Sequence, residues 1–508
     1  MKRWFGPGFL LLLVLAAALR FPELRLRPMH NDEAVNAIKF RDLWINHDYQ
    51  YDPNEFHGPT LPYFTLPAAW TDGAHDFNAL TEAAFRSIPV LFGLGLIAIL
   101  LLLTPEFGRA ETFWAAAFTA LSPAMVFYSR YYIHEMLLVF FTALAFGALW
   151  RYWRTGRFAW CAVAGVGLGL MWATKETFVF AVLSLALALL CAAGWTKCRD
   201  GAARNWKSLA AMAGIALAVA MVFFSSVFTH PAGMIDAFKT YLPWLHRAEG
   251  ASAHIHSWTF YFRRLLFYRA NGGPVWSEGL IVILAVVGGI SAMTGRPSLL
   301  VRIIAFYTLW MTLIYTLLPY KTPWCLLGFF HGMILLAGCG AAVLQRWKGG
   351  LIVLLLAGTA QLGWQAWRCN FAVDSGGVPY CDSVKNPYTY SQTTPDIFRL
   401  IETVDGVAKA SPDGYGTIVD VMSPESPWPL PWYLRRFTKV GYWNNIPSQP
   451  LAPIMIVSAD LHAAFDERPE KTHLMAGYFQ LRPGVFFELY VNVDLWTRYV
   501  KTLPPGKD

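Results

Sequence analysis

The sequence predicts a polytopic α-helical membrane protein of about eleven transmembrane helices, followed by an extracytoplasmic C-terminal α/β domain. Of its 508 residues, 56% are hydrophobic and only 15% are charged, which is too apolar for a soluble chain of this length. Apolar runs near the ~20 residues that a membrane span needs recur as far as residue 364. The formal net charge of +8 does not indicate a nucleic-acid partner, because the cations are scattered between these runs.

Eleven apolar runs mark the expected helices. They centre on residues 5–19, 88–103, 112–127, 136–152, 158–172, 178–195, 209–228, 280–293, 301–318, 324–344 and 351–364. Several are short for a span, so the count has a margin of one or two. No small-residue cleavage site follows the first run, so we expect a retained helix and not a cleaved signal.

Loop charges predict the orientation. One set of short loops, around residues 151–157, 197–207, 296–302 and 346–348, is rich in Lys and Arg, whereas the opposite set holds one cation in each loop. The rich set is expected to be cytoplasmic. This predicts a multi-pass protein of the plasma (inner) membrane with a cytoplasmic N-terminus. Residues 1–367 would form the transmembrane domain, with outer loops 20–86 and 230–277, and residues 368–508 an extracytoplasmic domain.

The C-terminal domain is expected to mix helices and strands. Residues 394–408 read as a helix, which Thr393 or Thr394 would cap. Residues 417–422, 453–458 and 485–491 read as strands, because β-branched and aromatic residues are concentrated there. Cys369 and Cys381 bracket a Gly-Gly loop, and an oxidising compartment would allow them to form a disulfide.

Two adjacent carboxylates, Asp32 and Glu33, follow the first apolar run. One interpretation is capping: Asn31 or Asp32 starts a helix that runs to about Ile45, and the helix dipole favours Glu33 in its first turn. The other is functional, because charged groups held near a membrane tend to serve a function. The sequence leaves both interpretations open.

Sparse charges in further outer loops point to one cavity. The second outer loop contains Arg130, His134 and Glu135 among three tyrosines, which is either an aromatic belt with a snorkelling arginine or part of a site. Lys175 and Lys321 lie in two other loops on the same side. We therefore expect charges from four loops to converge.

Three other residues are candidates for the same cavity. His57, in a His-Gly-Pro triplet, is either a turn residue or a lining residue that positions an acceptor or metal. Arg263 and Arg264 precede a later span and are expected phosphate contacts. The expected phosphate-binding set is Arg130, Lys175, Lys321, Arg263 and Arg264.

These residue types suit a lipid-linked phosphate. Carboxylates can act as a general base or hold a divalent cation, while isolated cations near the membrane bind phosphate. A sugar on polyprenyl phosphate fits this chemistry, because its tail stays in the lipid bilayer and its phosphate is a good leaving group. A base for the acceptor hydroxyl and cations for the departing phosphate would complete the reaction.

Seven motifs carry a resemblance to known proteins. They are "MHNDEAVNA", "HGPTLPY", "SRYYIHEM", "ATKE", "LPYKTPW", "NPYTYSQTTPD" and "WPLPWYLR", and they run in this order from Met29 to Arg435. The combination resembles the glycosyltransferase-C superfamily. It is most similar to the bacterial and archaeal flippase-activity-associated family, which is related to the dolichyl-phosphate-mannose protein mannosyltransferases.

The resemblance implies roles for several residues. Asp32 stands at the place of the catalytic acid, with Glu33 beside it. His134 and Glu135 stand where related enzymes place acidic residues that bind metal or position the acceptor, although here the pair is His-Glu in place of Asp-x-Asp. A divalent cation, Mg²⁺ or Mn²⁺, would have Asp32, His134 and Glu135 as candidate ligands.

Three functional hypotheses follow. The first is a glycosyltransferase that moves a sugar from polyprenyl phosphate to a protein, lipid or glycan acceptor outside the cytoplasm, with inversion and with Asp32 as base. The second is a flippase or flippase-associated component without catalysis, which would place polar features at mid-membrane in related halves. The sequence has no such internal repeat. The third is a non-catalytic assembly protein that presents its C-terminal domain to a partner.

Overall fold

The computed structural model describes residues 4–54, 57–71, 76–243, 254–294, 298–345, 350–448 and 451–504. Residues 296 and 346–348, from the loops that predict the orientation, lie outside these ranges. Contacts along the chain divide it into two compact units. Unit 1 comprises Met1–Leu24, Asp42–Gly73 and Thr81–Tyr390, and unit 2 comprises Arg25–Arg41, Ala74–Leu80 and Ser391–Asp508.

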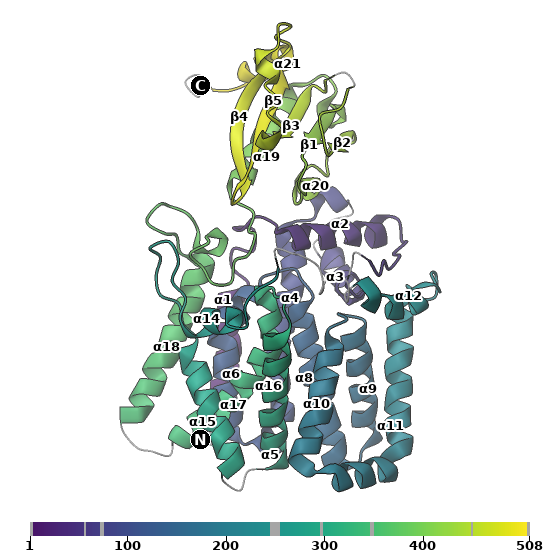
Figure 1. Ribbon diagram of the computed structural model, residues 1–508, viewed down its shortest axis with the longest axis vertical. Helices are drawn as coiled ribbons and strands as arrows, with labels where there is room; N and C mark the ends of the chain where they lie inside the picture. Colours follow the sequence, from purple (N-terminus) through teal and green to yellow (C-terminus); the bar gives the residue numbers. More distant parts are fainter. Residues whose placement is uncertain are drawn as a thin grey trace. The chain divides into compact units, whose positions relative to one another are not determined.

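Unit 1 is helical (Figure 1). Its main helices are α1 (Phe5–Arg20), α4 (Glu82–Ile99), α6 (Arg109–Leu121), α7 (Pro123–Ser129), α8 (Glu135–Thr155), α9 (Phe158–Trp172), α10 (Phe178–Ala193), α11 (Trp195–Phe224), α15 (Gly279–Thr294), α16 (Leu299–Leu317), α17 (Leu327–Leu344) and α18 (Gly350–Phe371). Short helices α3 (Thr60–Thr71), α5 (Thr104–Phe107), α12 (Gly233–Lys239) and α14 (Phe260–Leu266) lie between them.

Each of the eleven predicted apolar runs coincides with helix in unit 1. Within the described residues, six helical segments are long and apolar enough to cross a membrane: those containing α4, α8, α11, α16, α17 and α18. Four shorter apolar helices, α1, α9, α10 and α15, accompany them. The protein is therefore a helical membrane protein.

The run at 112–127 is broken between α6 and α7. Pro123 has no backbone N–H to continue the helix, and the Ser122 hydroxyl caps α7 by accepting from the Met125 N–H at 3.2 Å. The break leaves carbonyls of α6 without helical partners. The buried guanidinium of Arg20 fills this role, donating to Thr119 O at 2.8 Å and Ala120 O at 2.9 Å.

Glycines allow α15 and α17 to pack backbone against backbone. A Cβ at Gly288 would lie 2.0 Å from Leu336 O, and one at Gly340 would lie 2.1 Å from Leu284 O. No side chain fits at either position. This is the small-residue packing by which helices associate in lipid, where the hydrophobic effect supplies little attraction between them.

Unit 2 contains a five-stranded sheet of order β2-β1-β3-β5-β4. Its strands are β1 (Val419–Met422), β2 (Val440–Trp443), β3 (Ile454–Ser458), β4 (His473–Arg482) and β5 (Val485–Asn492). β1 pairs in parallel with β2 and β3, while β5 pairs antiparallel with β3 and β4. Helices α19 (Asp396–Ala410), α20 (Leu430–Tyr433) and α21 (Val493–Val500) complete this α/β domain.

The boundary of the C-terminal domain differs from the prediction of residue 368. Residues 368–390 belong to unit 1, because α18 continues to Phe371 and the next segment folds back on it. Asn386 Nδ2 donates to Cys369 O at 3.3 Å, and Trp276 Nε1 donates to Lys385 O at 2.7 Å.

Unit 2 also takes in two pieces of the predicted outer loop 20–86. Tyr433 Oη accepts from the Met29 N–H at 2.9 Å, and Thr393 Oγ1 donates to Met29 O at 2.8 Å. Arg435 Nη2 donates to Leu80 O at 2.9 Å. Because Thr393 is used in this way, and Thr394 Oγ1 donates to Gln480 O, neither threonine caps α19, and that prediction is wrong.

The predicted Cys369–Cys381 disulfide is not formed in the structure, where both side chains are buried. Cys369 lies in the last turn of α18, and its thiol points back along the helix to donate to Ala366 O at 3.3 Å. Cys381 instead faces the carboxylate of Asp382 at 3.6 Å. The two side chains are turned to different partners.

Candidate active site

An apolar cavity of about 510 Å³ lies inside unit 1. Helices α8, α10, α16 and α17 lie side by side (Figure 1) and supply much of its wall. Its charged lining residues are Glu135 and Lys175 near one end of α10 and Lys197 beyond the other. Since α10 has 16 residues, these ends are about 24 Å apart. The cavity is therefore long, apolar and charged at its ends.

Lys175 and Glu135 form a buried ion pair at this wall, with only 4% and 5% of each residue exposed. Burial alone would lower the pKa of Lys175, but the adjacent Glu135 carboxylate reverses this and raises that pKa well above its usual range. The lysine therefore keeps its charge. Trp324 and Cys325, from the loop that contains Lys321, line the same cavity.

His134 and Glu176, which adjoin Glu135 and Lys175 in the sequence, both contact His57 of the predicted first outer loop. His57 Nδ1 lies 3.0 Å from Glu176 Oε2, and the rings of His57 and His134 are 5.2 Å apart, edge to face. Burial would raise the pKa of Glu176, but the charge and hydrogen bond of His57, with help from Lys175, lower it. Three of the predicted loops thus converge, and Glu176 is a participant that sequence reasoning missed.

The His-Gly-Pro triplet is needed for this convergence. A Cβ at Gly58 would lie 2.1 Å from Ala173 O, so only glycine lets the two loops approach. The Gly58 N–H donates to Thr174 O at 3.1 Å, and Gly58 O lies 3.0 Å from His134 Nε2. The triplet is a tight turn that also places His57 in the site.

The Nδ1 atom of His134 is an unused hydrogen-bond acceptor within the described part of the chain. Burial, followed by the charges of His57 and Lys175, lowers the pKa of His134 well below its usual value, so the ring is neutral. Its Nε2–H donates to the Gly58 carbonyl, which leaves Nδ1 with a lone pair. Among the described residues, neither this buried Nδ1 nor Glu176 Oε1 has a hydrogen-bond partner. Both atoms suit a ligand that donates hydrogen bonds.

The implied divalent cation does not fit these residues. Within the described parts of the chain, no three His, Cys, Asp or Glu side chains gather as metal ligands. Glu135, one of the candidate ligands, is paired with Lys175. We therefore derive no step through a metal.

A second group of cations surrounds His256. Lys321 is buried, and Nζ donates to His256 O at 3.3 Å and to Leu318 O. Arg264 stacks on Phe260, 3.7 Å from the ring centre, and Nε donates to Pro387 O at 3.1 Å. Burial lowers the pKa of His256, and Arg264 and Lys321 add to the effect. In this part of the described chain the cations meet carbonyls and rings and have no carboxylate partner.

Two predicted phosphate ligands are placed elsewhere. Arg130 Nη1 donates to Arg20 O at 2.9 Å and to Pro22 O at 2.6 Å, so its guanidinium fixes the segment that leaves α1. Arg263 is exposed on α14, next to the half-buried Arg264. Neither arginine lines the cavity.

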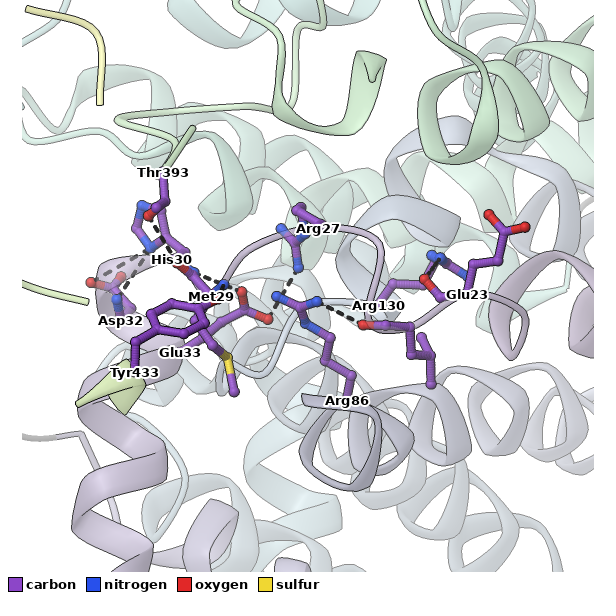
Figure 2. Close-up of polar contacts among 11 residues, drawn as sticks. Glu23, Arg27, Met29, His30, Asp32, Glu33, Arg86, Arg130, Thr393 and Tyr433 are labelled. Atoms are coloured by element: carbon purple, nitrogen blue, oxygen red, sulfur yellow. Dashed lines mark hydrogen bonds and ion pairs between the residues drawn. The ribbon is translucent and has the colours of Figure 1, made fainter. Parts of the chain in front are cut away.

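The Asp-Glu pair belongs to unit 2 and has two different environments (Figure 2). Glu33 is fully buried; it accepts from Arg27 Nη2 at 3.0 Å and from the His30 N–H at 2.9 Å. The bond from the His30 N–H joins Glu33, in the first turn of helix α2 (Asn31–Ile45), to the residue before the helix, as in a capping box. Asp32 has a side chain 49% exposed, with Oδ1 4.0 Å from His30 Nδ1. His30, whose carbonyl accepts the first helical bond from Ala34, takes the N-cap place predicted for Asn31 or Asp32.

Glu33→Gln is expected to lower the free energy of unfolding by about 3 kcal/mol, because it removes the charge of a carboxylate that is paired with the Arg27 guanidinium in a buried environment. Thermal melts in detergent would measure the loss. Asp32→Asn, which changes an exposed neighbour, serves as the control and should melt like the wild type. An unchanged melt for Glu33→Gln would contradict a structural role for this carboxylate.

Glu278 is a buried acid that sequence reasoning did not identify. Its Oε1 accepts from the Ala124 N–H and from Tyr388 Oη, each at 2.8 Å. Burial raises its pKa from 4.5 to about 7, despite these hydrogen bonds. The only signal for it in the sequence is an acid immediately before an apolar run.

Glu278 is expected to make stability fall as pH rises. Between pH 4.5 and 7 the folded protein holds a proton on Glu278 that the unfolded chain has lost, so the free energy of unfolding decreases by about 3 kcal/mol across this window. Glu278→Gln should remove this decrease. Parallel pH–stability curves for the wild type and the variant would contradict it.

One protein-family model and several solved structures are similar to this chain. Residues 62–232 match the family model of dolichyl-phosphate-mannose-protein mannosyltransferase. No curated protein sequence matches the chain. ArnT from Cupriavidus metallidurans in the apo state has a TM-score of 0.64 at 14% identity, over 95% of this chain and 98% of that one. ArnT has also been solved bound to undecaprenyl phosphate, with a TM-score of 0.60.

The archaeal oligosaccharyltransferase AglB from Archaeoglobus fulgidus, in complex with an inhibitory peptide and a dolichol-phosphate, has a TM-score of 0.58 at 13% identity, over 99% of this chain and 75% of that one. In the A. fulgidus structure tethered with an acceptor peptide, the match has a TM-score of 0.55 at 13% identity, over 87% of this chain, and spans 64% of that one. The protein therefore shares the fold of ArnT and AglB. Its residues 62–232 are similar to the dolichyl-phosphate-mannose-protein mannosyltransferase family.

Proposed function

We propose that this protein is a glycosyltransferase that moves a sugar from a polyprenyl-phosphate carrier to an acceptor on the extracytoplasmic face of the plasma (inner) membrane. The observation that carries the proposal is the long apolar cavity with Lys175 at its wall. An isoprenoid tail suits its apolar lining, and an ammonium group suits a phosphate. The likeness to ArnT, solved with undecaprenyl phosphate, supports this donor class.

In this mechanism the chain supplies three functions. Lys175 binds the donor phosphate and stabilises the charge that develops when its bond to the anomeric carbon breaks. The lone pair of His134 Nδ1 accepts a hydrogen bond from a hydroxyl of the bound sugar or acceptor. Asp32, the exposed member of the acidic pair, takes the proton from the acceptor hydroxyl, whose oxygen attacks the anomeric carbon.

Charge and stereochemistry follow from this single displacement. The electron pair of the broken bond remains on the phosphate, which leaves as polyprenyl phosphate, and the acceptor oxygen joins the sugar with inversion. Lys321 lies in the loop that also supplies Trp324 to the cavity wall, and Arg264 lies on α14, where it acts on the same His256 as Lys321. They are further candidates for contact with the donor phosphate.

The test is a liposome assay with a panel of radiolabelled polyprenyl-phosphate sugars. Release of free polyprenyl phosphate that requires the protein, together with transfer of the label to a water-soluble or lipid acceptor, is the expected result and identifies the donor. Protein-dependent movement of intact labelled lipid between leaflets, without release from any donor, would replace this proposal with the flippase hypothesis.

A further inference from the structure

Glu135 is an unexpected residue in a cavity assigned to a phosphate. It is the first residue of α8, it is buried, and it lines the cavity beside Lys175. Lys175 is its ion-pair partner within the described residues. Glu176, the other nearby acid, is oriented to His57. A carboxylate next to the phosphate ligand weakens binding of every anion, so a site built only for affinity would omit it.

The charge of the lipid changes during the reaction that we propose. The donor is a phosphodiester, which has one ionisable oxygen and a charge of −1. The product is a phosphate monoester, whose charge at pH 7 is about −1.5 to −2, because its second pKa is about 6. Lys175 attracts the added charge and Glu135 repels it. The ion pair therefore cancels much of the affinity that the product would gain from its second charge.

We infer that Glu135 is a product-release residue, which discriminates against the spent polyprenyl phosphate in favour of the sugar-linked donor. This inference rests on the proposed function, because it requires a lipid phosphate at Lys175. Glu135 acts through charge and forms no bond to the sugar, so it is a specificity-determining residue and not a catalytic one.

The test measures lipid binding without turnover. Purified protein is titrated with polyprenyl phosphate and with its methyl phosphodiester, at pH 5.5 and pH 8, for wild type and Glu135→Gln. The glutamine keeps the shape of Glu135 and a hydrogen bond to Lys175. In the variant, the affinity for the monoester should rise about ten-fold from pH 5.5 to pH 8, as its second proton is lost. In the wild type it should stay level or fall.

The diester provides the internal comparison, because its charge is constant over this range. Glu135→Gln should change its affinity by the same factor at both pH values. Both lipids meet the same titratable groups around the ion pair, in the wild type and in the variant. These groups are Lys175, Glu176, His57, His134, Cys325, Tyr315 and Tyr128. Their titration therefore cancels when the affinity for the monoester is divided by the affinity for the diester.

Two controls separate the possible failures. Glu106→Gln removes a carboxylate that pairs with Arg154 outside the cavity. It should leave the ratio of monoester affinity to diester affinity unchanged. Glu135→Asp keeps the charge and should behave as the wild type, and thermal melts show whether each variant is folded. If Glu135→Gln does not fold, a ten-fold rise of monoester affinity with pH in the wild type would itself overturn the inference.

The remaining outcomes are distinct. Equal pH dependence of monoester binding in wild type and Glu135→Gln would overturn the product-release role and leave the proposed function intact. Binding of neither lipid to the wild type would overturn the proposed function and this inference with it.

Discussion

Asp32→Asn is expected to lower the rate of polyprenyl phosphate release by about 10²- to 10⁴-fold, the usual contribution of a general base. Asparagine keeps the size and the exposed position of the side chain but cannot accept the proton of the acceptor hydroxyl. Because Asp32 is half exposed and its chain neighbour Glu33 makes the buried contacts, stability should not change. The measurement is the initial rate in liposomes, with the donor that the panel identifies.

Two further variants make this result specific. Asp460→Asn changes an exposed carboxylate elsewhere in unit 2 and should retain the wild-type rate. Asp32→Glu keeps a base but moves it by one methylene, so part of the activity should remain. A wild-type rate for Asp32→Asn would show that another group takes the proton.

Lys175→Met is expected to have the second large effect, on both binding and stability. It removes the cavity's ammonium group near Glu135 and leaves that carboxylate buried without its partner, which costs about 3–5 kcal/mol. Binding of the methyl phosphodiester, which has the charge of the donor, should fall below detection in the titration described above, and the melting temperature should drop.

A double variant separates these two effects. Lys175→Met with Glu135→Leu replaces the ion pair by apolar side chains, a change that is often neutral or stabilising. Stability should therefore recover while donor binding and release stay absent. A folded double variant that releases polyprenyl phosphate at the wild-type rate would contradict the role of Lys175 as the phosphate ligand.

Helices of unit 1 were predictable because hydropathy is a local property of the chain. Every predicted run coincides with helix, and the break at Ser122-Pro123 also has a local cause. Strands β2 and β4 were not predicted. β2 is a short edge strand that contains Gly441, and the pairing of β4 with β5 shifts register around Gly477, so neither has a regular pattern.

The site could be predicted only in part, because its side chains contact residues that are distant along the chain. The sequence placed cations near one cavity, but it could not assign their neighbours. Arg130 was predicted to bind phosphate, but in the structure its guanidinium donates to the carbonyls of Arg20 and Pro22, at the end of α1. His57 and Glu176 are 119 residues apart, and no spacing rule connects them. The sequence could not separate the environments of Asp32 and Glu33, and only the structure shows that Glu33 is buried while Asp32 is half exposed.

The division of unit 2 into three chain segments has a consequence for biosynthesis. Met29, three residues before Asp32, is held by Thr393 and Tyr433, which follow it by 364 and 404 residues. At a ribosomal rate of about 5–20 residues per second, the second partner emerges roughly 20–80 s after Met29. The membrane helices can insert during this interval, but the segment that bears Asp32 cannot reach its final fold. The site that we propose at Asp32 therefore cannot be complete until translation is nearly finished.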